Sequence, residues 1–238
     1  MKKQFEKKHF SKVVIPLSIT VVFLLISVFV YDIISYMYYN HKMNYNKIRY
    51  METLAYHRYI KKQVNNYNNI IAISDYIKRN NFFHDEINSF DLAVSIVKES
   101  SNKNLDPFLV LAIIEVESNF DHNSRSTMDA RGLMQLRNPT ALYISKMENI
   151  EISSSNLKTD PILNIKLGIA YLRYLIDKFD GNYKYALIAY NLGINKVYSL
   201  MSANINLPKS YYYKVISSYK KINNIYKHQE LKQIQETP

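Results

Sequence analysis

A run of 19 residues without a charged side chain, Val13 to Tyr31, limits what this chain can fold into more than any other feature. As an α-helix, which rises about 1.5 Å per residue, the run spans roughly 28 Å, close to the hydrocarbon thickness of a bilayer, about 30 Å. Five lysines precede the run, and the positive-inside rule then keeps the N-terminus in the cytoplasm. We therefore predict a basic cytoplasmic segment at residues 1–12 and a single-pass transmembrane signal anchor at residues 13–38. The rest of the chain is expected on the extracytoplasmic side of a cytoplasmic membrane.

The alternative for the same run is a signal peptide that is removed after export. Such a peptide ends in a small-residue cleavage site of the A-x-A type. The segment after the run, YDIISYMYYNHK, contains no such site, and the run itself is long. These features favour an uncleaved anchor, although Lys42, Lys47 and Arg49 on the far side of the run argue weakly against the orientation.

Residues 39–89 are rich in tyrosine, asparagine and lysine, and their apolar residues recur at roughly helical spacing, for example at Ile48, Met51 and Leu54. Two structures fit this pattern, a helical stalk and a solvated linker. We expect the segment to be partly helical, and the sequence does not distinguish the two.

The net charge of +11 is carried by the two ends of the chain. Residues 90–207 hold 12 basic and 12 acidic side chains, residues 1–89 hold 13 and 6, and residues 208–238 hold 6 and 2. A nucleic-acid-binding domain would carry its basic surface on the folded domain. The distribution therefore favours a membrane surface or an anionic polymer as partner and argues against nucleic acid. The chain has no cysteine and its 6 histidines have no paired spacing, so we expect no disulfide, no metal site and no cofactor.

From about residue 90 the pattern predicts an all-α domain, residues 90–226, followed by a polar tail, residues 227–238. Three Asx-Pro pairs precede apolar runs with helical periodicity, and each offers a capping side chain and a proline suited to the first helical turn. These pairs are Asp106-Pro107, Asn138-Pro139 and Asp160-Pro161. Gly181 follows the run that starts at Pro161, Gly193 closes the separate run YKYALIAYNLG, and both suit the left-handed residue that ends a helix. The expected helices are 90–101, 107–120, 139–147, 161–179, 183–192 and 209–226.

Two glutamates lie two positions apart in the apolar segment AIIEVESNF, residues 112–120. On a helical wheel of about 100° per residue with Ile113 at 0°, Glu117 falls at about +40°, inside the apolar stripe, and Glu115 at about 200°. Burial raises the pKa of a carboxyl, and a general acid near neutral pH requires a raised pKa. We therefore predict a solvated surface charge at Glu115 and a functional carboxyl at Glu117. The alternative is that Glu117 only pairs with an arginine such as Arg131.

Four blocks follow one another along residues 90–215 in an order that resembles the soluble lytic transglycosylase family. The blocks are VLAIIEVES, SRSTMDARGLMQL, DPILNIKLGIAYLRYLIDKF and ALIAYNLG. Each block alone is a weak signal, whereas four in sequence with appropriate gaps are a strong one. The family consists of lysozyme-like α-helical enzymes that cleave the glycan strands of peptidoglycan, so the resemblance implies a lysozyme-like catalytic domain here.

Carried over position by position, the resemblance implies that Glu117 is the catalytic acid/base. It implies substrate-contacting side chains at six further positions, which are Ser118, Met134, Gln135, Tyr190, Asn191 and Tyr213. Outside the blocks, the Tyr190-Asn191 pair also fits a core tyrosine followed by a C-cap asparagine, and Met134 also fits a core filler. The chain departs from the family at Asp129, where the family usually has glycine.

The resemblance implies a peptidoglycan lytic transglycosylase, a carbon-oxygen lyase that cleaves the β-1,4 bond between N-acetylmuramic acid and N-acetylglucosamine. In this reaction one carboxyl, at Glu117, serves as both acid and base, and the muramic acid's own C6 hydroxyl closes a 1,6-anhydro ring. One alternative is a lysozyme-type muramidase in which Asp129 holds a water, although we expect Asp129 to face outward at a turn. The other alternative is a non-catalytic scaffold that binds peptidoglycan.

Overall fold

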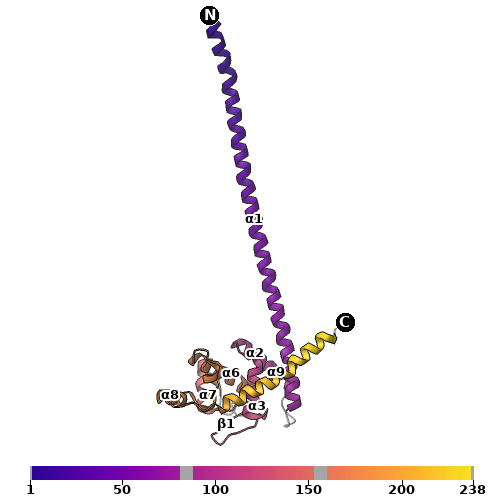
Figure 1. Cartoon of the computed structure of the whole chain (residues 1–238), viewed down its shortest axis with the longest axis vertical. Coiled ribbons are helices and arrows are strands. Elements are labelled where there is room, and N and C mark those ends of the chain that lie inside the picture. The colour runs from indigo at the N-terminus through magenta and orange to yellow at the C-terminus, as the bar shows by residue number, and fades with distance from the viewer. Residues whose placement is uncertain (1, 81–87, 153–159, 237–238) are drawn as a thin grey trace. The chain divides into compact units, whose positions relative to one another are not determined.

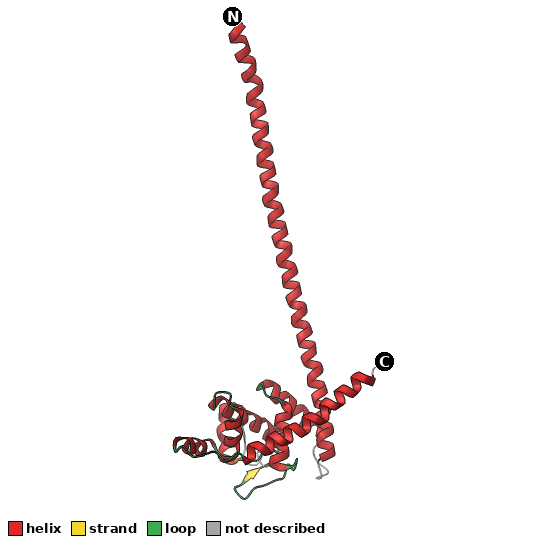
Figure 2. Ribbon diagram, viewed as in Figure 1, coloured by secondary structure: helices red, strands yellow, loops and turns green. Residues whose placement is uncertain are grey.

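The computed structural model describes the backbone of residues 2–80, 88–152 and 160–236, and the side chains of residues 19–80, 88–152 and 160–226. The chain divides into two compact units, Met1–Lys62 and Gln63–Pro238. Helices dominate both units, and a short strand is visible in the second unit (Figure 2).

The first unit consists of one helix, α1 (Lys2–Asn80), whose last turns belong to the second unit. Among the described side chains, which begin at Ile19, this is the one helix long and apolar enough to cross a membrane. The large apolar residues between Ile19 and Ile34 are exposed, and Phe23, Leu24 and Phe29 are each at least 65% exposed. The side chains of the predicted basic segment 1–12, of the first residues of the predicted anchor, and of the predicted tail 227–238 lie outside the described residues.

The segment that the sequence left open between stalk and linker is helical as far as Asn80. Apolar residues near the end of α1 are buried in the second unit, with Ile73 and Ile77 at 0% and 1% exposure. The second unit therefore starts well before the predicted boundary at residue 90. The reason is that these residues repeat at helical spacing and cover the domain core, which a composition shift does not reveal. Residues 81–87 of the predicted linker lie outside the described residues.

All six helices predicted in residues 90–226 are present, and Figure 1 labels α2, α3, α6, α7 and α9 among them. Their bounds are α2 (Ser89–Asn102), α3 (Pro107–Ser118), α4 (Asn138–Met147), α6 (Pro161–Lys178), α7 (Tyr183–Leu192) and α9 (Ser210–Glu236). The sequence did not predict the helix α8 (Ile194–Ser202), nor an antiparallel pair of strands, β1 (Ala130–Arg131) and β2 (Leu136–Arg137). Gly193, with φ +85° and ψ 139°, is both the C-cap of α7 and the N-cap of α8, so no polar spacer marks the second start.

Two of the three predicted helix caps are confirmed. Asp106 accepts a hydrogen bond from the Phe108 amide at 2.8 Å, and Asp160 accepts one from the Ile162 amide at 2.9 Å. The prediction for Asn138 is wrong, because Asn138 is the first residue of α4 and Arg137 occupies the cap without a side-chain bond. The chain enters α4 directly from β2, which moves the helix start one residue earlier.

The core of the second unit surrounds α3. Leu111, Ala112 and Ile113 are fully buried, and Ile114 is 1% exposed. Helix α9 packs on α3, while α6 packs on α2, α4 and α7. A segment with apolar residues on nearly every side is expected at the centre of a helical domain, and this placement surrounds the C-terminal end of α3 with other elements.

Candidate active site

Glu117 lies one residue before the end of α3, which stops where Asn119 and Phe120 take positive φ angles of 48° and 65°. Its side chain is largely buried, in agreement with the helical wheel. Burial raises the pKa of Glu117 to about 7, and a hydrogen bond from Tyr211 acts in the opposite direction. A carboxyl with this pKa is half protonated near neutral pH, so it can both give and take a proton there.

Tyr211 is the residue that contacts the Glu117 carboxyl. Its hydroxyl, carried by α9, donates to Oε1 of Glu117 at 2.6 Å. Its ring stacks on Tyr190 of α7 with the centroids 6.5 Å apart and the planes 6° from parallel. Both tyrosines are 8% exposed, and burial together with the nearby Glu117 charge raises the pKa of each well above 10. Tyr211 therefore stays a hydrogen-bond donor over the whole range in which Glu117 titrates.

The loop between α3 and α4 is fixed to α6 by a single amide side chain. Asn164 accepts from the Met134 amide N–H at 2.8 Å and donates to the Arg131 carbonyl at 3.0 Å. Gly132, with φ +75°, lies so close that a Cβ there would be 2.6 Å from the Asn164 side-chain nitrogen. Similarly, a Cβ at Gly168 of α6 would be 2.8 Å from the Met134 Cβ. The two glycines thus let the loop backbone and α6 approach each other closely.

The predicted site residues on this loop and beside it make contacts inside the protein. The Ser118 hydroxyl, 9% exposed, donates to the carbonyls of Ile114 at 3.1 Å and Leu133 at 2.9 Å. The side-chain nitrogen of Gln135, whose φ is +47°, donates to the carbonyls of Ser124 at 3.0 Å and Gly132 at 2.9 Å. Both side chains therefore shape the loop that follows Glu117.

Met134 is fully buried. This burial disagrees with the prediction that the Met134 side chain contacts substrate, because a side chain without exposed surface cannot touch a bound sugar. Its thioether packs against Gly168, which fits the core filler that the sequence also allowed. The Met134 carbonyl still matters locally, since it accepts a 2.9 Å hydrogen bond from the Tyr190 hydroxyl.

The remaining predicted residues lie near the ends of α7 and α9. Tyr190 is buried against Tyr211 as described, and Asn191, the next residue, is exposed. Tyr213 is 60% exposed and its ring contacts Tyr212, with the centroids 5.3 Å apart. The structure places Tyr211, not Tyr213, at the Glu117 carboxyl.

Sequence reasoning missed Tyr211 and Asn164, although each left a signal. Tyr211 shares one helical stripe with Val215, Ser218 and Ile222, and all four are buried, so the wheel of 209–226 would have separated it from Tyr213. Asn164, 1% exposed, is a polar residue inside the apolar run PILNIKLGIAYL and lies one turn before Gly168. A buried amide in an apolar stripe requires hydrogen-bond partners, which here are backbone groups of the loop.

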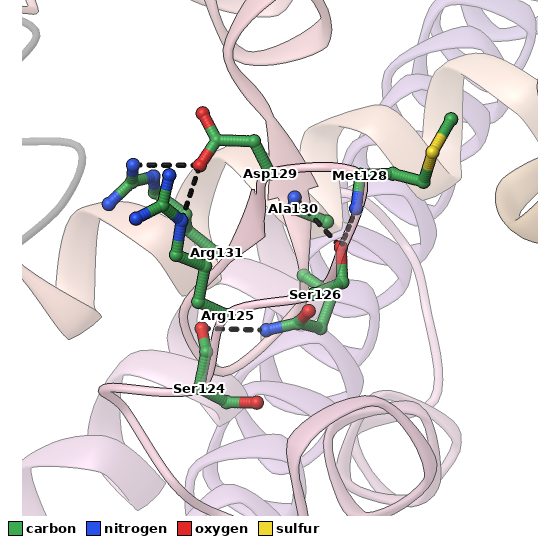
Figure 3. A network of polar contacts seen from close by, with 8 residues as sticks. Ser124, Arg125, Ser126, Met128, Asp129, Ala130 and Arg131 are labelled. Carbon is green, nitrogen blue, oxygen red and sulfur yellow. Dashed lines mark hydrogen bonds and ion pairs between the residues drawn. The ribbon is translucent and has the colours of Figure 1, made fainter.

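Asp129 is held at a turn by two arginines (Figure 3). It has φ +59°, a conformation that aspartate tolerates better than most residues. Its carboxylate forms ion pairs of 2.7 Å with both Arg125 and Arg131, and its side chain is 44% exposed. Arg131 is thus the partner of Asp129, and the alternative in which Arg131 pairs with Glu117 is wrong.

Glu115 is not the solvated charge that the wheel predicted. Its side chain is 13% exposed and accepts hydrogen bonds from the Tyr76 hydroxyl at 2.8 Å, from the Lys221 ammonium at 2.6 Å and from the Ser218 hydroxyl. Burial alone would raise the pKa of Glu115, but these three donors outweigh it and lower the pKa below its ordinary value. The helical wheel shows correctly that Glu115 lies opposite the core stripe, but it cannot show that α9 and the end of α1 cover that face.

Among the described side chains, the structure brings together no group of three or more acidic or histidine residues able to hold a metal ion. The fold and the site together define a helical domain with one buried, readily protonated carboxyl at the end of its central helix.

Comparison with known proteins identifies this class. The sequence model of the family described as "Transglycosylase SLT domain" matches residues 95–224, more than half of the chain. The chain belongs to this family.

Among curated relatives, the soluble lytic murein transglycosylase of Escherichia coli strain K12 is 34% identical over 99 residues, which cover 41% of this chain and 15% of that protein. The membrane-bound lytic murein transglycosylase C of Edwardsiella ictaluri is 35% identical over 122 residues, which cover 47% of this chain and 34% of that protein. The chain thus matches well under two thirds of each relative's length. The crystal structure of the 70-kDa soluble lytic transglycosylase of Escherichia coli superposes with a TM-score of 0.50 at 27% identity, covering 55% of this chain and 24% of that one.

Proposed function

We propose that this protein is a lytic transglycosylase of peptidoglycan, and that Glu117 is its single acid/base. The proposed reaction cleaves the β-1,4 bond between N-acetylmuramic acid and N-acetylglucosamine. The observation that carries the proposal is the carboxyl at Glu117, whose pKa of about 7 and hydrogen bond from Tyr211 suit a group that must change protonation state twice. Family membership and the names of the relatives support the same activity.

In the first step, protonated Glu117 gives its proton to the oxygen that bridges the two sugars. The bond from that oxygen to C1 of the muramic acid breaks, and the N-acetylglucosamine side leaves as an alcohol. Positive charge builds up on the muramic acid at C1, where the substrate's acetamido group assists. Glu117 is left ionised, and the Tyr211 hydroxyl at 2.6 Å stabilises the new charge.

In the second step, ionised Glu117 takes the proton of the muramic acid's C6 hydroxyl. The C6 oxygen then bonds to C1, closing the 1,6-anhydro ring, and Glu117 is again protonated for the next cycle. Because the nucleophile belongs to the substrate, its effective concentration is high and no water has to be held and activated. One carboxyl therefore suffices for the whole reaction.

The hydrolytic alternative requires a second carboxylate, which in glycosidases lies about 5–9.5 Å from the first. In the part of the chain that the structure describes, burial and the Tyr211 hydroxyl set the pKa of Glu117, and no other acidic side chain contributes. Asp129 is paired with two arginines at a turn, which disfavours it as a holder of water. These observations favour the anhydro product over the hydrolytic one.

We also propose that α1 anchors the protein in the cytoplasmic membrane, with the N-terminus in the cytoplasm and the catalytic unit on the other side. The apolar, exposed surface of α1 from Ile19 onward supports this arrangement, and so do the lysines that precede it in sequence. In this setting Ser118, Gln135, Tyr190, Asn191 and Tyr213 are proposed to line or support the substrate site.

The test is a digest of purified peptidoglycan by the full chain in detergent micelles, analysed by mass spectrometry. We expect muropeptides ending in 1,6-anhydro-muramic acid, which are about 18 Da lighter than hydrolytic products because no water is added. Glu117→Gln should release no product while keeping its circular dichroism spectrum. Reducing ends would favour the muramidase, and intact glycan strands with retained binding would favour the non-catalytic scaffold.

A further inference from the structure

The catalytic helix α3 is attached to α9 through both of its glutamates. Glu117 accepts from Tyr211, and Glu115 accepts from Ser218 and Lys221, all three of which lie on α9. Residues two apart in a helix point about 160–200° away from each other, so the two carboxylates leave α3 on different sides and still end on the same neighbouring helix. Along α9, Ser218 lies seven residues, about two turns, beyond Tyr211.

We define the Glu115 cluster as Tyr76, Glu115, Ser218 and Lys221. Within it, Glu115 is an ionised acceptor and the other three are donors. Such charge-assisted hydrogen bonds are stronger than neutral ones, and a largely buried carboxylate strengthens them further. The cluster therefore fixes how far α9 can slide or rotate on α3.

The last turns of α1 complete the cluster. The Tyr76 side chain is 2% exposed, its hydroxyl donates to Glu115 at 2.8 Å, and its ring meets Phe120 edge-on with the centroids 6.0 Å apart. The Lys221 ammonium lies 5.7 Å from the centre of the same ring. Tyr76 thus connects the residues after Glu117 to α9 in one packed unit.

We propose that the Glu115 cluster holds Tyr211 on Glu117, so that Glu115 is a positioning residue for the catalytic carboxyl. This inference rests on the proposed function for its meaning in catalysis, but its geometry is independent of the substrate. Glu115 acts only through the placement of α9. Tyr211 shares that helix with Ser218 and Lys221, and it has no other charged partner than Glu117 among its described contacts.

The charged and titratable groups that face the two glutamates are different. Glu115 faces Tyr76 from α1 and Lys221 from α9, whereas Glu117 faces Tyr211 from α9 and Tyr190 from α7. A change at Glu115 therefore reaches Glu117 through a shift of α9 and not through a shared titratable neighbour. A purely structural role of Glu115 would lower stability and leave the titration of Glu117 where it is.

The test is a double-mutant cycle in the full chain in detergent micelles, made of the wild type, Glu115→Gln, Tyr211→Phe and the double variant. The titration of Glu117 is followed by carbon-13 NMR of labelled glutamate carboxyls, with Glu117→Gln used for assignment. Tyr211→Phe removes a donor to the ionised form, so the Glu117 titration should move up by about one pH unit. Glu115→Gln should move it in the same direction and lower kcat on peptidoglycan roughly tenfold with little change in KM.

The cycle then gives a clear result. If Glu115 acts through Tyr211, adding Glu115→Gln to Tyr211→Phe should move the Glu117 titration no further. Glu148→Gln is the matched control, because it breaks a partly buried ion pair with Lys103, 2.5 Å long, away from α9, and should not move the titration. Full additivity, or an unmoved titration in Glu115→Gln, would overturn the proposal.

Two further arms keep the test decisive. If Glu115→Gln does not fold, Ser218→Ala removes one donor of the Glu115 cluster and carries the same expectation with a smaller shift. If the wild type does not cleave peptidoglycan, the proposed function fails, while the NMR titrations still decide whether Glu115 positions Tyr211.

Discussion

Tyr211 donates a 2.6 Å hydrogen bond to Oε1 of Glu117, although 94 residues separate them in the sequence. The bond opposes the effect of burial on the carboxyl, so the pKa of Glu117 stays near 7 instead of rising further. It also favours the ionised form, which each proposed catalytic cycle must pass through.

Tyr211→Phe tests this relationship in the catalytic reaction. Loss of a hydrogen bond to a charged group weakens the ionised form by about 1.5–3 kcal/mol. The alkaline limb of the pH dependence of kcat/KM, where the proton donor is lost, should therefore move to higher pH by about one unit or more. We expect the maximal rate to fall at least tenfold, because the charge formed on Glu117 in the first step loses its donor.

The control for this variant is Tyr212→Phe, which removes a hydroxyl from the adjacent position on α9. It should leave both limbs of the profile in place. An unchanged profile for Tyr211→Phe would show that its hydroxyl does not act on Glu117.

Glu117→Gln should make the protein more stable at alkaline pH. The pKa of Glu117 is raised from 4.5 in the unfolded chain to about 7 in the folded protein, so the folded state binds more protons between these values. Stability is then lost as pH rises from about 4.5 to 7, by about 3 kcal/mol in total. Glutamine cannot ionise, so its gain over the wild type should be near zero at pH 4 and approach about 3 kcal/mol at pH 8. Urea unfolding followed by near-UV circular dichroism at both pH values measures this.

Glu115→Gln is expected to have the opposite effect on stability at alkaline pH. The folded-state pKa of Glu115 is lowered, so its charge stabilises the fold above the unfolded pKa, and this contribution is lost as pH falls through the folded pKa. The variant should thus be less stable than the wild type at pH 8 and closer to it in acid. If the stability of both variants changed with pH in the same way as that of the wild type, the raised pKa of Glu117 and the lowered pKa of Glu115 would be contradicted.

The start of the folded unit can be tested by truncation. A fragment of residues 90–238 lacks Ile73, Tyr76 and Ile77, which are at most 2% exposed. Burial of each such side chain contributes about 1.5–3 kcal/mol, so the fragment loses much of a typical domain's stability of about 5–15 kcal/mol. We expect residues 63–238 to unfold cooperatively and residues 90–238 to lack a sharp transition in near-UV circular dichroism. If both fragments unfolded in equally sharp transitions, the folded unit would start at residue 90, as the sequence predicted.

Gly168→Ala should destabilise the protein by about 1–3 kcal/mol, the usual range for overpacking a core. The added methyl carbon would be 2.8 Å from the Met134 Cβ, and the helix or the loop must then move. Met134→Ala on its own leaves a cavity, but combined with Gly168→Ala it removes Sδ, the atom closest to the added methyl carbon, and Cε, 3.0 Å from it, so that only the contact with Cβ remains. The double variant should therefore be more stable than the sum of the two single effects predicts, as measured by urea unfolding. Additive losses would mean that the two residues do not constrain each other.

Local signals explain what the sequence predicted well. The segment 107–120 carries a cap at Asp106, a proline at the first turn and an apolar stripe that includes Glu117, and all three act over a few residues. The same stripe was enough to predict that Glu117 is buried. Helix α8 was missed because Gly193 joins two helices without a polar spacer.

The contacts that complete the site are not local, and this is why they were not predicted. A helical wheel shows that Glu115 lies opposite the core stripe, but not that Tyr76 and Lys221 from distant segments cover it. In the same way, the run of three tyrosines at 211–213 does not show by itself which ring reaches α3. Only the stripe shared with Val215 and Ile222 would have indicated Tyr211.

The attachment of the loop to Asn164 has a consequence for how the protein ages. One atom of this side chain gives a hydrogen bond and the other receives one, and asparagine is distinguished from aspartate only by that nitrogen. Deamidation at residue 164 would add about 1 Da, replace the donor by an oxygen facing the Arg131 carbonyl, and place a charge in a closed space. The exchange of one side-chain nitrogen for an oxygen would then weaken the attachment to α6 of the loop that carries Gln135, leaving the bonds from Ser118 and Tyr190 to hold it.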